Sequence, residues 1–335
     1  FNVLQSIEHA SIDPNIKGIY MDLTNMSISL TAAEEIRRAL EQFKLSETFI
    51  IAYADSYSQG SYYFATIADK VYLNPYGSAI LSGMSPQVMI FTRTLEKLGI
   101  EMQVIRHGKF KSAIEPFVNK EISPENREQI MAYAGSIWSY LVEEISKSRN
   151  IKVEELNTVI DNILSRNAQT ALELKLVDGI MYKDEVISEL CRLMDVDSEQ
   201  KLNVVSFSDY LRLSRRTSAS KDRIAIIYAS GEIVMGERSA AVSSGYLTKA
   251  IKKARYDKNV KAFVFRVDSP GGDAQASEII ARELELAAKE KPVIVSMGSV
   301  AASGGYWIAT PASVILANHT TLTGSIGVFG MVPNI

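Results

Sequence analysis

The sequence has a single cysteine and only three histidines among 335 residues, and it has no long apolar run. One cysteine excludes an intrachain disulfide, and the apolar pattern around Cys191 predicts a small buried side chain rather than a reactive thiol. No apolar stretch approaches the roughly 18 residues of a membrane-spanning helix. The net charge of -3 gives no sign of nucleic-acid binding, so the basic cluster at 212–216 is expected to be a solvated linker.

The sequence also lacks metal-ligand spacing and any phosphate-binding glycine loop, so we expect neither a metal nor a cofactor. At 335 residues, 47% of them hydrophobic, the chain suits a soluble protein of two domains with substantial cores. Its first residue is Phe1 rather than a methionine, which leaves room for a removed anchor or signal segment.

The three histidines do not form the pattern of a serine-protease triad. His9 lies on a segment that looks like a surface helix, His319 lies in a polar loop that favours a turn, and His107 precedes a glycine. None has a suitably placed acid beside it, so a Ser-His-Asp triad is not expected. A serine nucleophile in this chain would need another base, and a lysine serves if burial depresses its pKa.

The best candidate nucleophile is Ser303, in the small-residue stretch VAASGGYW at 300–307. This stretch follows an apolar run at 292–296 that predicts a buried strand, and the start of a helix there would favour developing negative charge. A second glycine pair, Gly271 and Gly272, follows the predicted strand 262–267. Such a turn can expose N–H donors to a tetrahedral oxyanion. Each turn alone is more often structural, but the two lie at the ends of successive strands.

An internal repeat gives the domain organisation. A shift of 244 positions, without a gap, aligns residues 13–20 with 257–264, the strand 49–51 with 293–295, and residues 60–66 with 304–310. Each copy alternates strand, turn and amphipathic helix, which predicts an α/β domain with parallel strands and right-handed crossovers. The expected helices include 32–43 and 276–287.

The two copies differ in chemistry. Under the same shift Gln59 takes the place of Ser303, and Ser27 and Ile28 take the places of Gly271 and Gly272. The first copy therefore lacks both the nucleophile and the glycine turn, and we interpret it as having lost its own site.

Candidate lysines lie in residues 107–117, after a predicted strand at 101–105. Alternation about Phe110 puts Lys109 and Lys111 on the same face. The residues alone do not choose between these lysines, and either would ordinarily be a solvated surface charge.

Four motifs together resemble those of the signal peptide peptidase A family, also called protease IV, in its long tandem-repeat form. They are GKFKSAIEPF at 108–117, DSPGG at 268–272, ASGGYW at 302–307 and LTGSIG at 322–327, and LKLVDG at 174–179 adds to the likeness. The resemblance implies that Ser303 is the nucleophile, Lys111 the general base and Ser325 the hydroxyl that orients the lysine. It also implies that the N–H of Gly271 or Gly272 serves the oxyanion hole.

The resemblance implies the Clp-protease/crotonase type of fold in two tandem copies. We expect a first repeat at 1–118 that carries the lysine, a helical connecting region at 119–221 and a second repeat at 222–335 that carries the serine. The active site should then lie where the two copies meet. Residues 206–222 are the predicted boundary before the second copy, and both copies are expected to be truncated.

The resemblance further implies a membrane-anchored parent on the extracytoplasmic side of the bacterial inner membrane, a homotetramer, and the remnants of signal peptides as substrates. Two other function classes stay open from the residues: a crotonase-like acyl-CoA enzyme, which needs no serine nucleophile, and a non-catalytic scaffold of the same fold.

Overall fold

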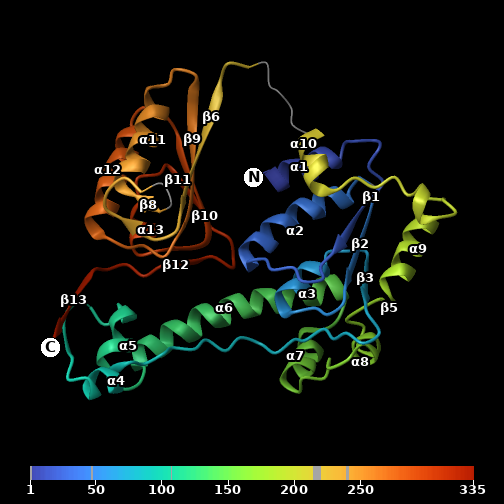
Figure 1. Cartoon of the computed structure of the whole chain (residues 1–335), viewed down its shortest axis with the longest axis horizontal. Helices are drawn as coiled ribbons and strands as arrows, with labels where there is room; N and C mark the ends of the chain where they lie inside the picture. The colour runs from blue at the N-terminus through green and yellow to red at the C-terminus, as the bar shows by residue number, and fades with distance from the viewer. Residues whose placement is uncertain (1, 47, 107, 214–219, 239–240) are drawn as a thin grey trace. The chain divides into compact units, whose positions relative to one another are not determined.

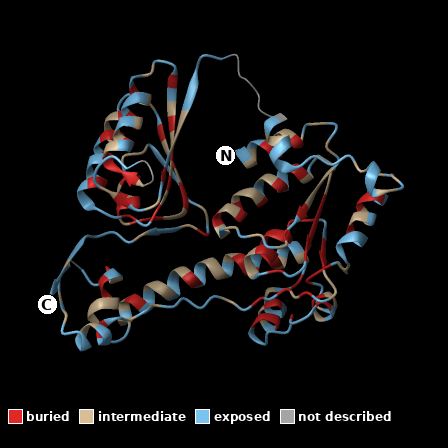
Figure 2. Cartoon of the chain, in the orientation of Figure 1, coloured by how far each residue is buried: buried red, intermediate tan, exposed pale blue. Residues whose placement is uncertain are grey.

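The computed structural model describes residues 2–46, 48–106, 108–213, 220–238 and 241–335 (Figure 1). The chain forms two compact units. The first unit combines Phe1–Met84 with Trp138–Ser218, and the second combines Ser85–Ile137 with Ala219–Ile335. In each unit the buried residues follow the central strands and the inner sides of the helices (Figure 2).

The first unit is built on a parallel sheet of order β1-β2-β3-β5. Its strands are β1 (Gly18–Asp22), β2 (Phe49–Ala54), β3 (Lys70–Leu73) and β5 (Gly179–Ile180). The helices wholly within this unit are α1 (Asn2–Ala10), α2 (Leu30–Lys44), α3 (Gln59–Ala65), α7 (Val153–Asp161), α8 (Ala168–Glu173), α9 (Lys183–Leu193) and α10 (Phe207–Leu213), with a 3-10 turn η2 (Glu199–Lys201). Cys191 lies buried on α9, as predicted.

The second unit has a parallel sheet of order β11-β10-β9-β6, with β12 also paired to β10. Its strands are β6 (Arg223–Ser230), β9 (Val260–Ser269), β10 (Val293–Ala302), β11 (Val314–Leu316) and β12 (Leu322–Gly324), beside the short pair β7 (Ile233–Val234) and β8 (Val242–Ser243). Helices α11 (Ser244–Tyr256) and α12 (Ala274–Ala288) lie along one face of the sheet (Figure 1). Phe263, Phe265 and Val295 form the core with Ile280 and Leu284 of α12.

The repeat seen in the sequence is present in the structure. Helices α2 and α12 begin and end at positions 244 residues apart, and so do the first residues of β2 and β10. Both helices are capped by side chains at equivalent positions: Ser29 Oγ accepts from Ala32 N at 3.2 Å, and Asp273 Oδ1 accepts from Ala276 N at 2.7 Å. The predicted α/β class with parallel sheets is confirmed.

A separate group of short elements belongs to the second unit. It contains α4 (Thr92–Lys97), β4 (Glu101–Arg106), a 3-10 turn η1 (Ser112–Ile114) and α5 (Glu115–Val118). Strand β4 pairs in antiparallel fashion with β13 (Phe329–Asn334), near the end of the chain. Because of this pairing, residues 85–118 are grouped with the second unit, although the repeat assigns them to the first copy.

Among its described residues, the expected connecting region at 119–221 contains the long helix α6 (Pro124–Arg149) and the shorter helices α7 to α10. Helix α6 starts at a proline, and Leu141 and Ile145 on it are fully buried. The boundary at 206–222 differs from a simple linker, because its first part forms α10, while residues 214–219 lie outside the described residues. In the part of the chain that the structure describes, no helix has both the length and the apolar character needed to cross a membrane.

Candidate active site

Ser303 stands at the junction of β10 and the single-turn helix α13 (Gly304–Trp307). Its backbone has φ 55° and ψ -119°, a conformation that side-chain-bearing residues rarely adopt. Two hydrogen bonds hold it: Ser303 N donates to Gly324 O at 2.8 Å, and Trp307 N donates to Ser303 O at 2.9 Å. The strained turn is therefore fixed from both sides, which presents a half-buried hydroxyl at the strand end.

Lys111 meets that hydroxyl within the second unit. Lys111 Nζ lies 2.9 Å from Ser303 Oγ, a hydrogen bond between residues 192 positions apart in the chain. The lysine is only 5% exposed. Its burial lowers the pKa of the amine below the ordinary 10.5, because an ammonium loses hydration there. A neutral amine at this distance can accept the serine proton.

Ser325 provides the other two partners of the amine. Lys111 Nζ donates to Ser325 O at 2.7 Å and to Ser325 Oγ at 3.1 Å. Ser325 itself has φ 49° and directly follows β12. The three oxygens around Nζ are neutral, so they fix its position without favouring its charged form as a carboxylate would. The structure thus brings Ser303, Lys111 and Ser325 together in one cluster.

The glycine turn at 271–272 packs against the nucleophile's own turn. A Cβ on Gly271 would lie 2.6 Å from Gly304 N and 2.9 Å from Ser303 Cβ, and Gly271 has φ 97°. Its N–H donates to Ser269 Oγ at 3.1 Å. Gly272 is exposed, and within the described residues no hydrogen bond to its N–H is found. Of the two predicted oxyanion donors, Gly272 is therefore the more available.

The sequence interpretation missed a further donor, the N–H of Gly304. This group lies in the first turn of α13, where backbone N–H groups have no partner within the helix. The close approach of Gly271 places its backbone against Gly304 N. The signal was available, since Gly304 directly follows the candidate nucleophile at a predicted helix start. Because α13 has only four residues, local N–H groups matter here more than a helix dipole.

The remaining candidates lie elsewhere. The Lys109 side chain is 80% exposed, with Nζ 3.8 Å from Glu125, so of the two lysines only Lys111 contacts Ser303. His9 Nδ1 bonds Tyr210 Oη at 2.8 Å in the first unit. His319 is exposed in the turn before β12, while His107 lies outside the described residues.

In the first unit, Gln59 fills the place equivalent to Ser303. Its Oε1 accepts from Ser82 N at 3.1 Å and from Gly83 N at 3.0 Å, and its Nε2 donates to Gly83 O at 3.2 Å. Gly83 is the position equivalent to Gly327 under the shift of 244. The glutamine amide thus closes the equivalent turn by hydrogen bonds and leaves no nucleophile there.

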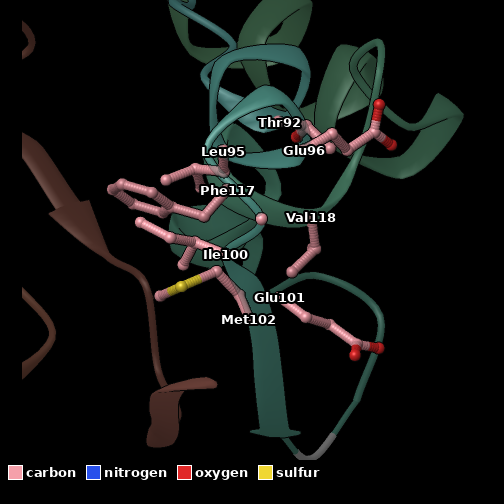
Figure 3. Close-up of a pocket in the computed structure, with 9 residues that line it drawn as sticks. Thr92, Leu95, Glu96, Ile100, Glu101, Met102, Phe117 and Val118 are labelled. Carbon is pink, nitrogen blue, oxygen red and sulfur yellow. The ribbon is translucent and has the colours of Figure 1, made fainter. Parts of the chain in front are cut away.

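A cavity of about 400 Å³ lies in the second unit between α4, β4 and α5 (Figure 3). Leu95, Ile100, Met102, Phe117 and Val118 face its interior, whereas the carboxylates of Glu96 and Glu101 point away from it (Figure 3). None of the predicted site residues lines this cavity, so we do not assign the active site to it.

Comparisons with known proteins agree with the motifs. A model of peptidase family S49 matches residues 42–197 and 285–335, more than half of the chain. The chain belongs to this family. It is 39% identical to Protease 4 of Haemophilus influenzae, over 99% of this chain and 56% of that protein. It is 37% identical to the chloroplastic serine protease SPPA of Arabidopsis thaliana, over 95% of this chain and 48% of that protein.

These relatives confirm the resemblance to signal peptide peptidase A, and the chain spans about half of their length. Among solved structures, a peptidase from Plasmodium falciparum covers 54% of this chain and 87% of its own, with 15% identity and a TM-score of 0.31.

Proposed function

We propose that this protein is a serine endopeptidase that hydrolyses peptide bonds through a Ser-Lys dyad. The observation that carries the proposal is the 2.9 Å contact between Lys111 Nζ and Ser303 Oγ, made by a lysine that is 5% exposed. A serine becomes a good nucleophile only when a base takes its proton, and a desolvated lysine can do this near neutral pH.

In the proposed mechanism, Ser303 Oγ attacks the carbonyl carbon of the scissile bond while its proton passes to Lys111 Nζ. The negative charge that develops on the carbonyl oxygen is stabilised by the N–H groups of Gly272 and Gly304. Lys111 then returns the proton to the departing amine, which leaves an acyl-enzyme on Ser303. A water deprotonated by Lys111 hydrolyses that ester. Ser325 keeps Nζ in place throughout.

The substrate and setting follow from the family. We propose that the peptides are the remnants of cleaved signal peptides. The whole protein would work as a homotetramer attached to the bacterial inner membrane, with the catalytic part on the extracytoplasmic side. The resemblance in the motifs around Ser303 and Lys111 supports this assignment.

A fluorophosphonate, which reacts with activated serines, tests the proposal. In the full-length protein it should label Ser303, as mapped by mass spectrometry of the digested product, and block the cleavage of an apolar fluorogenic peptide. Ser303→Ala should lose both the label and the cleavage. An acyl-CoA enzyme of the same fold would turn over an acyl-CoA thioester without being labelled, and a scaffold would do neither. Either result would overturn the proposal.

A further inference from the structure

Glu115 is a fully buried carboxylate just beyond the proposed base, with 0% exposure. Its oxygens accept three hydrogen bonds: from Ser123 N at 3.1 Å, from Ser123 Oγ at 2.5 Å and from Asn126 Nδ2 at 2.9 Å. A buried carboxylate is costly without such partners. The three bonds therefore fix Glu115 to the start of α6.

The start of α6 is itself well defined. Ser123 Oγ also accepts from Asn126 N at 3.1 Å, which makes Ser123 the cap of that helix. From this cap α6 runs for 26 residues. Glu115, the first residue of α5, thus connects the short segment 111–118 to the long helix α6.

The short segment is the one that carries Lys111. The lysine directly precedes η1, which has three residues, and α5, which has four. Such short helices are not stable alone, so tertiary contacts must hold them. The segment is also tied by Phe91 N to Pro116 O at 2.7 Å and by Thr92 Oγ1 to Asn119 O at 2.6 Å. Both of these ties lie beyond Glu115, whereas Glu115 is the buried charged anchor nearest to the lysine.

We propose that Glu115 is a positioning residue for the base: it clamps the Lys111 turn to the start of α6 and so keeps Nζ beside Ser303 and away from water. This inference rests on the proposed Ser-Lys dyad. Glu115 makes no direct contact with substrate or with Ser303 in this role, and it acts through the backbone of residues 111–115.

We call the three hydrogen bonds from Ser123 and Asn126 to Glu115 the clamp. The charges around the clamp indicate that Glu115 holds the Lys111 turn in place rather than acting on the lysine through its charge. Burial raises the pKa of Glu115, but the hydrogen bonds from Ser123 and Asn126 and the charge of Arg106 on β4 bring it below the ordinary 4.5. The carboxylate is therefore ionised at neutral pH. The pKa of Lys111 is lowered by burial alone. Two further charged residues near this segment, Lys109 and Glu125, pair with each other at 3.8 Å, and Lys120 pairs with Glu96 at 3.1 Å.

The test is the pH dependence of kcat/KM for Glu115→Gln in the full-length protein. The amide keeps only one acceptor oxygen and no charge, so it cannot accept from Ser123 N and Asn126 Nδ2 on one side and from Ser123 Oγ on the other as the carboxylate does. The weaker bonds loosen the Lys111 turn and admit water to the amine. The pKa of the base then rises, so kcat/KM near neutral pH should fall roughly tenfold, and the loss should shrink as the pH is raised.

Glu283→Gln is the matched control. Glu283 on α12 is also buried, with 7% of its side chain exposed, and it pairs with Arg255 at 3.4 Å and Lys252 at 3.5 Å. Glu283→Gln should lower the melting temperature. It should not move the acid limb of the pH profile, which is the rise of kcat/KM as the pH increases from acid. Should Glu115→Gln fail to fold, Ser123→Ala removes one bond of the clamp and should move the limb in the same direction by less.

An acid limb that stays in place in Glu115→Gln overturns the inference. So does a limb that moves to lower pH, because that direction indicates a direct charge effect on the lysine. The proposed function fails separately, if replacing Lys111 itself leaves Ser303 fully reactive.

Discussion

Burial is the property that would let the primary amine of Lys111 act as the proposed base at Ser303. In water a lysine is protonated at neutral pH and cannot accept a proton. Lys111 is withdrawn from solvent, and among the described residues its amine bonds to Ser303 and Ser325, so its pKa is lowered by burial without a charged partner to oppose the effect. A histidine would titrate near neutral pH without such burial. Because the sequence offers no suitable histidine, a base for Ser303 has to be a lysine whose pKa is lowered by burial.

The direction of this pKa shift predicts the pH profile of the enzyme. In the proposed dyad the neutral amine is the active form, so kcat/KM should be low in acid and rise with pH through the pKa of Lys111. Because burial lowers that pKa, the midpoint should lie below the ordinary 10.5 of a lysine. Peptide cleavage measured across the pH range checks this. A limb at the ordinary lysine value, or a flat profile, would contradict the assignment of Lys111 as base.

At the scale of elements, the site depends on two turns whose backbones touch. The β9–α12 turn and the β10–α13 turn approach so closely that Gly271 faces Gly304 N with no room for a side chain. This contact aligns the proposed oxyanion donors with the nucleophile. It explains physically why glycines stand at these strand ends.

Gly271→Ala should therefore damage catalysis more than stability. The added Cβ would meet Gly304 N at 2.6 Å and Ala302 O at 2.9 Å, so the donor turn must shift. We expect kcat to fall by about 10²–10³-fold, the loss seen when one oxyanion donor is misplaced. Unfolding in urea should show a cost of about 1–3 kcal/mol from the strained backbone.

Gly231→Ala is the control for that strain. Gly231 has φ 108°, but a Cβ there would meet no atom within 4 Å. It should share the stability loss and keep kcat near the wild-type value. Equal effects of the two variants on kcat would show that the contact between the turns does not matter for catalysis.

The equivalent turn of the first unit predicts a different outcome. Gln59→Ala removes the acceptor for Ser82 N and Gly83 N, so the free energy of unfolding should drop by about 1–3 kcal/mol. Labelling of Ser303 by a fluorophosphonate should stay unchanged, because Gln59 lies in the first unit and the dyad in the second. Denaturant unfolding and labelling rates measure the two effects. Loss of labelling in a folded variant would show that the first copy still takes part in the chemistry.

At the scale of the whole molecule, local patterns could be predicted from the sequence and long-range contacts could not. The shift of 244 residues predicted matching helices and strands, and α2 and α12 follow it at both ends. Ser303 and the glycine pair could be found because strand ends and turns are local signals. The choice of Lys111 over Lys109 came only from the family resemblance. The physical basis of that choice, burial by segments far along the chain, is not visible in a local pattern.

The position of the site depends on strand pairing as well as on the repeat. The repeat predicted an active site between the two copies, with the lysine in one and the serine in the other. In the structure the pairing of β4 with β13 brings the lysine segment into the second unit, so both groups lie in the same compact unit. A repeat records which residues share an origin, whereas strand pairing decides which residues pack together.

The most direct test of the account is the reactivity of Ser303 when Lys111 is replaced by a neutral side chain of similar length. Lys111→Met in the full-length protein should slow labelling by a fluorophosphonate by at least about 10²-fold, the usual contribution of a general base. Lys109→Met, at a side chain that is 80% exposed, should label at the wild-type rate. Labelling of a folded Lys111→Met variant at the wild-type rate would contradict the claim that this lysine activates the serine.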